Sequence, residues 1–65
     1  MASYSKELIV NAYLHRFVMA DIDINTIEIL EKQANSHYDK VGRDKFREHA
    51  SVTPEAIRVY KLFAG

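Results

Sequence analysis

The chain is nearly free of residues that interrupt helices, and this constrains its fold more than any other feature. Its 65 residues include one proline and two glycines, one of which is the last residue. Leu, Ile, Ala, Glu and Lys, which are common in helices, occur throughout. Residues 21–24 alternate like a strand, but four residues without a partner strand do not make a sheet. We therefore expect an all-α fold.

Capping chemistry predicts where three helices begin. The side chains of Ser5, Asn25 and Thr53 can each accept a hydrogen bond from a backbone N–H of a first helical turn. Apolar residues flank each of the three at the spacing of a hydrophobic staple. Pro54 follows Thr53 at the first helical position, where a missing N–H costs nothing. The predicted helices cover residues 5–19, 25–41 and 53–64.

The connections between these helices predict the architecture. Residues 20–24 form a loop short enough to make the first two helices an antiparallel hairpin. Gly42 is expected to end or bend the second helix. Residues 43–50 suit a short helix in which Phe46 and Ala50 face inward. We predict one domain, residues 1–65, that forms a small three- to four-helix bundle.

The sequence lacks the residues that most enzymes and metal sites use. There is no cysteine, no Gly-rich phosphate loop, and no serine in a nucleophile motif. His15, His37 and His49 are not spaced to share a metal ion on one helix. We therefore expect a protein that is not an enzyme and that holds no metal or cofactor.

The charges argue against a nucleic-acid partner. Nine Lys and Arg residues balance nine Asp and Glu residues, whereas nucleic-acid binders usually carry a positive excess. The segment 40–47 is locally basic, so a DNA-binding or nucleoid-associated helical regulator remains the alternative. No apolar run approaches the roughly 20 residues that span a membrane, and no signal peptide is evident at the N-terminus. We expect a cytoplasmic protein without a membrane partner.

A surplus of apolar residues is the main functional signal. The helix 5–19 is apolar around much of its circumference, and a monomer would leave one strip exposed. Exposed apolar patches on small proteins usually mark interfaces. The candidate partner-binding residues are Leu14, Val18, Ile22 and Ile24. A self-associating structural protein, which would bury this strip against a second copy, is a further alternative.

The hairpin also resembles a known family. Residues 5–14 read S-x-E-L-I-V-x-A-Y-L and residues 27–31 read I-E-I-L-E. This pattern is similar to Sda, a family of small inhibitors of sensor histidine kinases, over residues 4–35. Thr26 stands where that family has an aromatic residue, and residues 42–65 have no counterpart. The resemblance implies a partner surface at the hairpin turn, near Ile22 and Ile24.

Together these features predict a small regulatory or inhibitory protein. It would bind a larger partner protein, such as a kinase or another host enzyme, through apolar residues of the helical hairpin.

Overall fold

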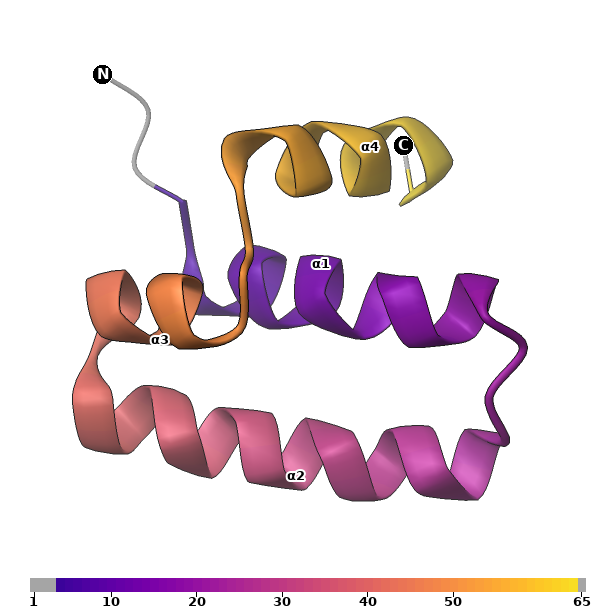
Figure 1. Cartoon of the computed structure of the whole chain (residues 1–65), viewed down its shortest axis with the longest axis horizontal. Coiled ribbons are helices and arrows are strands. Elements are labelled where there is room, and N and C mark those ends of the chain that lie inside the picture. The colour runs from indigo at the N-terminus through magenta and orange to yellow at the C-terminus, as the bar shows by residue number, and fades with distance from the viewer. Residues whose placement is uncertain (1–3, 65) are drawn as a thin grey trace.

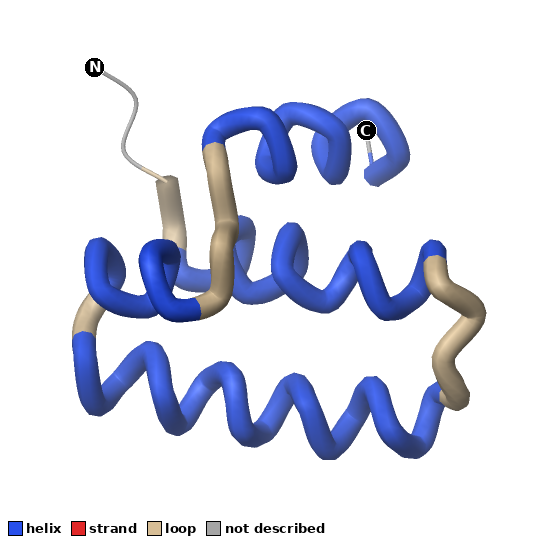
Figure 2. The backbone as a smooth tube through the Cα atoms, in the orientation of Figure 1, coloured by secondary structure: helices blue, strands red, loops and turns tan. Residues whose placement is uncertain are grey.

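The computed structural model describes residues 4–64, and the regular structure in this range consists of four helices (Figure 1). They are α1 (Lys6–Met19), α2 (Ile24–Val41), α3 (Arg43–His49) and α4 (Pro54–Ala64). Short connections join them (Figure 2). The predicted all-α fold is confirmed: the first two helices form the antiparallel hairpin, and a short helix and a C-terminal helix follow. No helix between residues 4 and 64 combines the length and apolarity needed to cross a membrane.

The first and last helices begin where their caps predict. The Ser5 hydroxyl accepts a hydrogen bond from the backbone N–H of Leu8 at 3.1 Å, and the Thr53 hydroxyl accepts one from Ala56 at the same distance. These bonds satisfy N–H groups that have no partner within the helix. Near the Thr53 cap, the expected staple residues Val52 and Ile57 are both buried.

The start of α2 differs from the prediction. Its N-cap is Asp23, whose carboxylate accepts a hydrogen bond from the backbone N–H of Asn25 at 3.0 Å. The prediction of Asn25 as the cap is therefore wrong, because the backbone of Asn25 already belongs to the first turn. The loop is correspondingly shorter, and Ile24 becomes the first residue of the helix.

Gly42 ends α2 and starts α3. Its backbone N–H donates to Tyr38 at 2.8 Å, and its carbonyl accepts from Phe46 at 2.9 Å. Its φ of 89° and ψ of 169° lie in a region that essentially only glycine occupies. The sharp turn brings Phe46 onto the rings of Tyr13 and Tyr38. The short helix predicted for residues 43–50 is therefore confirmed, and Phe46 is its buried anchor.

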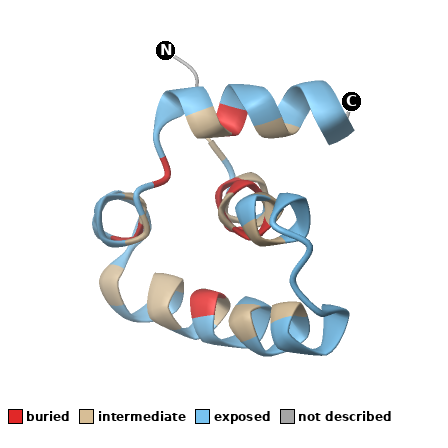
Figure 3. Ribbon diagram, turned by 45° about the vertical axis from the view of Figure 1, so that its right-hand side comes forward, coloured by how far each residue is buried: buried red, intermediate tan, exposed pale blue. Residues whose placement is uncertain are grey.

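Helix α1 lies at the centre of the fold. It packs against both α2 and α4, and Figure 3 shows it between these two helices. This position explains why its sequence is apolar around most of the circumference, since neighbours cover it on two sides. Val10 and Leu14, which precede Val18 on one side of the helix, are both buried. The strip that a monomer was expected to expose is instead covered along most of its length.

Candidate protein-binding surface

The large apolar side chains that remain exposed gather at one end of the molecule. Among residues 4–64 eight such side chains are exposed, and all eight belong to the elements that meet at this end. Six of them form the candidate surface, which leaves out Ile29 and Leu62. There α1 ends, the hairpin turns, α2 begins and α4 ends, on the right-hand side of Figure 1. We call this region the turn end; its exposed apolar residues are Val18, Met19, Ile22, Ile24, Val59 and Phe63.

Three of the four residues predicted to bind a partner are accessible at the turn end. Val18, Ile22 and Ile24 are exposed, and Ile24 retains 63% of its accessible surface. Leu14 retains only 6%, so its assignment to an exposed strip is corrected here. Leu14 lies one turn before Val18, on a part of α1 where Ile27 of α2 and Tyr60 of α4 line the same hollow. Leu14 itself lines this hollow, so only a small part of its side chain is accessible there.

Two shallow hollows between α1 and α4 meet at the turn end. Phe63 and His15 line both of them, and we call the two neighbouring hollows together the α1–α4 groove. Phe63 is 65% exposed and divides it. One side is lined by Val18, Ile27, Tyr60 and Ala64, and the other by Met19, Ala56 and Val59.

His15 places one unsatisfied polar atom beneath this groove. Its ring packs edge-on against Tyr60, with 5.6 Å between ring centroids, and lies 5.0 Å from the ring of Phe63. Its Nε2 atom is buried and has no hydrogen-bond partner. Buried polar atoms are nearly always paired.

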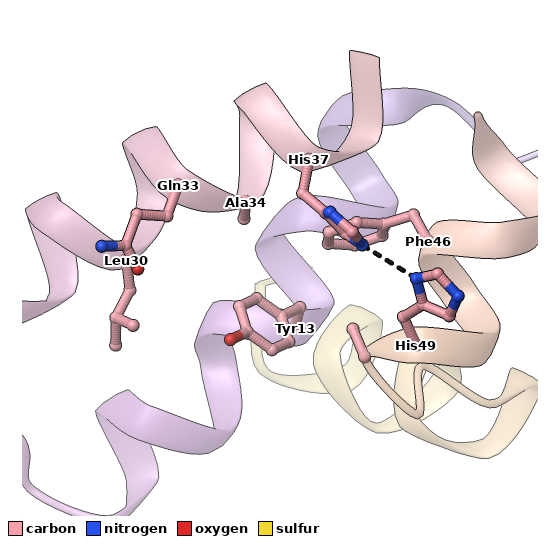
Figure 4. Close-up of a pocket in the computed structure, with 8 residues that line it drawn as sticks. Tyr13, Leu30, Gln33, Ala34, His37, Phe46 and His49 are labelled. Atoms are coloured by element: carbon pink, nitrogen blue, oxygen red, sulfur yellow. Dashed lines mark hydrogen bonds between the residues drawn. The ribbon is translucent and has the colours of Figure 1, made fainter. Parts of the chain in front are cut away.

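A further hollow, separate from the α1–α4 groove, lies at the opposite end of the molecule (Figure 4). Nε2 of His37 on α2 and Nδ1 of His49 on α3 lie 2.9 Å apart in a hydrogen bond. The pair ties the two helices together. Sequence spacing gave no sign of it, because the turn at Gly42 creates the contact. The part of the chain that the structure describes contains no group of three or more His, Cys, Asp or Glu residues able to hold a metal ion.

The basic segment that supported the nucleic-acid alternative is partly engaged within the protein. Nε of Arg47 donates to the carbonyl of Val52 at 3.3 Å, and the Arg47 guanidinium lies over the ring of Tyr4 at 5.3 Å. Arg43 forms an ion pair with Asp44 at 3.3 Å. A phosphate contact by Arg47 would compete with these internal contacts, whereas Lys40 and Lys45 are exposed.

Comparisons of the chain with models of protein families, with curated proteins and with solved structures found no match. The geometry of the turn end therefore has to support the functional proposal by itself.

Proposed function

We propose that this protein is a non-enzymatic regulator or inhibitor that binds a larger partner protein through the turn end. One observation carries the proposal: six large apolar side chains stay exposed at the turn end, and four of them, Val18, Met19, Val59 and Phe63, line the α1–α4 groove. Contiguous apolar surface of this kind on a small domain usually marks an interface. The residues proposed to contact the partner are Val18, Ile22 and Ile24 from the hairpin, joined by Met19, Val59 and Phe63.

The energy available from this surface is moderate. Fully burying a side chain of this size contributes about 1.5–3 kcal/mol. The six side chains are about half exposed, so covering them would contribute roughly 5–9 kcal/mol. Association itself costs on the order of 4–15 kcal/mol. The apolar contact therefore needs help from other complementary groups, and large aromatic side chains such as Phe63 are favoured anchors for it.

The mechanism that we propose is steric. The protein would occupy a surface that its partner needs for activity or assembly. The resemblance of the hairpin to kinase inhibitors makes a kinase one candidate partner, and another host enzyme could be blocked in the same way. The lack of cysteine suits a reducing compartment, and we propose the cytoplasm as the place of action.

A binding experiment with matched variants tests this proposal. The tagged full chain is used to capture proteins from lysate of its native host at low and high salt. Ile24→Asp should abolish capture of a stoichiometric partner, because it puts a charge into the apolar contact. Ile29→Asp is the matched control, since Ile29 lies on the same helix, is 57% exposed and stands outside the surface.

The outcomes separate the three classes of function. Loss of one salt-resistant partner with Ile24→Asp, and its retention with Ile29→Asp, supports the proposal. Equal capture by both variants would place the interface elsewhere. Nuclease-sensitive material released by salt would favour the DNA-binding alternative. A concentration-dependent dimer that Ile24→Asp disrupts would instead show a self-associating protein.

A further inference from the structure

Negative charge borders the apolar surface of the turn end in the hairpin turn and on α2. Asp21, Asp23, Glu28 and Glu31 are the only charged residues between positions 17 and 31, a stretch without Lys, Arg or His. All four are exposed. The ion pairs found among residues 4–64 involve other residues. The Asp23 carboxylate does accept a backbone hydrogen bond from Asn25, which leaves its charge in place.

Two of these carboxylates border the apolar residues of α2. Ile27, Glu28 and Glu31 lie three, four and seven residues after Ile24, so they share one side of the helix with it. Ile27 on this side lines the α1–α4 groove. The acidic groups therefore form a rim along the α2 side of the groove, and Asp21 extends the rim into the hairpin turn.

No ion pair among residues 4–64 joins a cation to this rim. Lys32 lies one turn after Glu28 on α2, close enough to offset part of its charge. Arg16 lines the groove, but its guanidinium donates to the carbonyl of Ser51 at 2.9 Å. Lys61 stands two positions from both Val59 and Phe63, which puts it nearly on the opposite side of α4. In addition α1 and α4 both end at this end of the molecule and α2 begins there. The partial negative charges of two helix C-termini exceed the partial positive charge of one N-terminus.

The negative charge beside the groove favours some binding partners and disfavours others. A second copy, docked turn end to turn end about a two-fold axis, would bring two acidic rims together, and like charges facing each other oppose association. Nucleic acids and anionic membrane surfaces are repelled for the same reason. A protein segment that combines apolar side chains with Lys or Arg is complementary to both the groove and its rim.

The form of that segment follows from the fold. The described part of the chain is helical and has no strand edge, so it cannot supply the main-chain hydrogen bonds that an extended peptide would need. A helix satisfies its own backbone groups and packs its side chains against those of other helices. We infer that the turn end binds an amphipathic helix whose apolar stripe fills the α1–α4 groove and whose flanking Lys and Arg residues face the acidic rim. This inference rests on the proposed function and specifies the partner.

Two synthetic helical peptides test the inference on the full chain. They share one stripe of Leu and Phe residues and differ only in their flanks, which are Lys and Arg in one peptide and Glu in the other. Fluorescence anisotropy should show about tenfold tighter binding of the basic peptide at low salt, as expected for a few rim charge pairs. Added salt should reduce the difference in affinity between the two peptides. NMR shifts should map to Val18, Ile24 and Phe63.

Matched charge variants identify the rim as the source of the preference. Glu28→Gln combined with Glu31→Gln should reduce the difference between the peptides to about threefold or less, since two rim charges are lost. Glu7→Gln combined with Glu48→Gln removes as many carboxylates from other parts of the surface and should leave the difference unchanged.

Three results would overturn the inference. They are equal binding of the two peptides, no binding of either peptide, and NMR shifts that fall outside the turn end. A chain that self-associates through Ile24 would likewise exclude a basic helix as the occupant of the groove. None of the peptide results decides the proposed function, which is tested separately by the capture experiment with Ile24→Asp and Ile29→Asp.

Discussion

At one end of the molecule Phe46, Val52 and Ile9 are almost completely withdrawn from solvent, whereas at the turn end Val18, Ile24 and Phe63 are more than half exposed. The difference comes from α3. The sharp turn at Gly42 folds this short helix back so that Phe46 covers the rings of Tyr13 and Tyr38. The hairpin turn at the other end has no comparable covering element within residues 4–64. The same chain therefore builds a closed core at one end and an open apolar surface at the other.

This comparison separates residues that stabilise the fold from residues available to a partner. A domain of this size has only about 3–5 kcal/mol of stability. Its packed end has to supply much of that, because the turn end buries its apolar side chains only in part. Substitutions at the two ends should consequently differ in their effects on unfolding, and each of the following experiments tests that difference.

The largest effect is expected for the two phenylalanines that characterise the ends. Phe46→Ala should cost about 3–5 kcal/mol, since it leaves a cavity at a fully buried site, and should unfold most of the population. Phe63→Ala should cost about 1 kcal/mol or less, because most of its ring is already in water. Urea unfolding followed by far-ultraviolet circular dichroism measures both.

Phe46→Leu keeps this comparison measurable if the alanine variant does not fold. It should cost less than Phe46→Ala and still more than Phe63→Ala. Equal destabilisation by Phe46→Leu and Phe63→Leu would show that the two ends are packed alike.

The next largest loss of stability is expected at Gly42, whose backbone conformation lets α3 cover the packed end. Gly42→Ala should cost on the order of 1–3 kcal/mol, because φ of 89° and ψ of 169° strain any residue with a Cβ. The added Cβ meets no atom within 4 Å, so the cost comes from the backbone alone. Gly42→Asn should be as harmful as alanine, although asparagine is tolerated at ordinary left-handed helix ends. A loss below about 0.5 kcal/mol in urea unfolding would refute this explanation.

Sequence reasoning succeeded where the controlling chemistry is local. Ser5 and Thr53 cap their helices through side chains that act within three residues. The same rule failed by two residues at α2, because Asp23 and Asn25 can both serve as caps and the local pattern does not rank them. Gly42 was predicted to end or bend the second helix. Its backbone angles could not be predicted, because they depend on where α3 packs.

The candidate surface was predicted only in its hairpin part. Val18, Ile22 and Ile24 could be found because they are apolar residues near a polar turn. Val59 and Phe63 were missed, because their place beside Met19 and Val18 depends on how α4 lies across α1. The burial of Leu14 has the same cause. Contacts between distant segments are tertiary properties, and helical periodicity does not report them.

Removal of a helix cap should destabilise the protein by a similar amount at the two ends. Ser5→Ala and Asp23→Ala should each cost about 1 kcal/mol, because each removes one hydrogen bond to an otherwise unpaired N–H group. Ser5→Thr and Asp23→Asn retain an acceptor and serve as controls, with losses of a few tenths of a kcal/mol. Thermal unfolding of the four variants provides the measurement. A much larger loss for either alanine variant would mean that its side chain has a packing role in addition to capping.

The smallest effect on the free energy of unfolding is expected for substitution of the exposed isoleucines of α2. A fluorescent dye should nevertheless detect the loss of Ile24 from the turn end. Ile24→Ser and Ile29→Ser should each alter the free energy of unfolding by about 0.5 kcal/mol or less, since both side chains are mainly in water. A neutral solvatochromic dye that binds apolar surface should fluoresce less with Ile24→Ser than with the unaltered chain and equally with Ile29→Ser, because only Ile24 belongs to the proposed surface. Equal fluorescence from both variants would mean that the exposed apolar residues of the turn end act as isolated side chains and do not form a continuous surface.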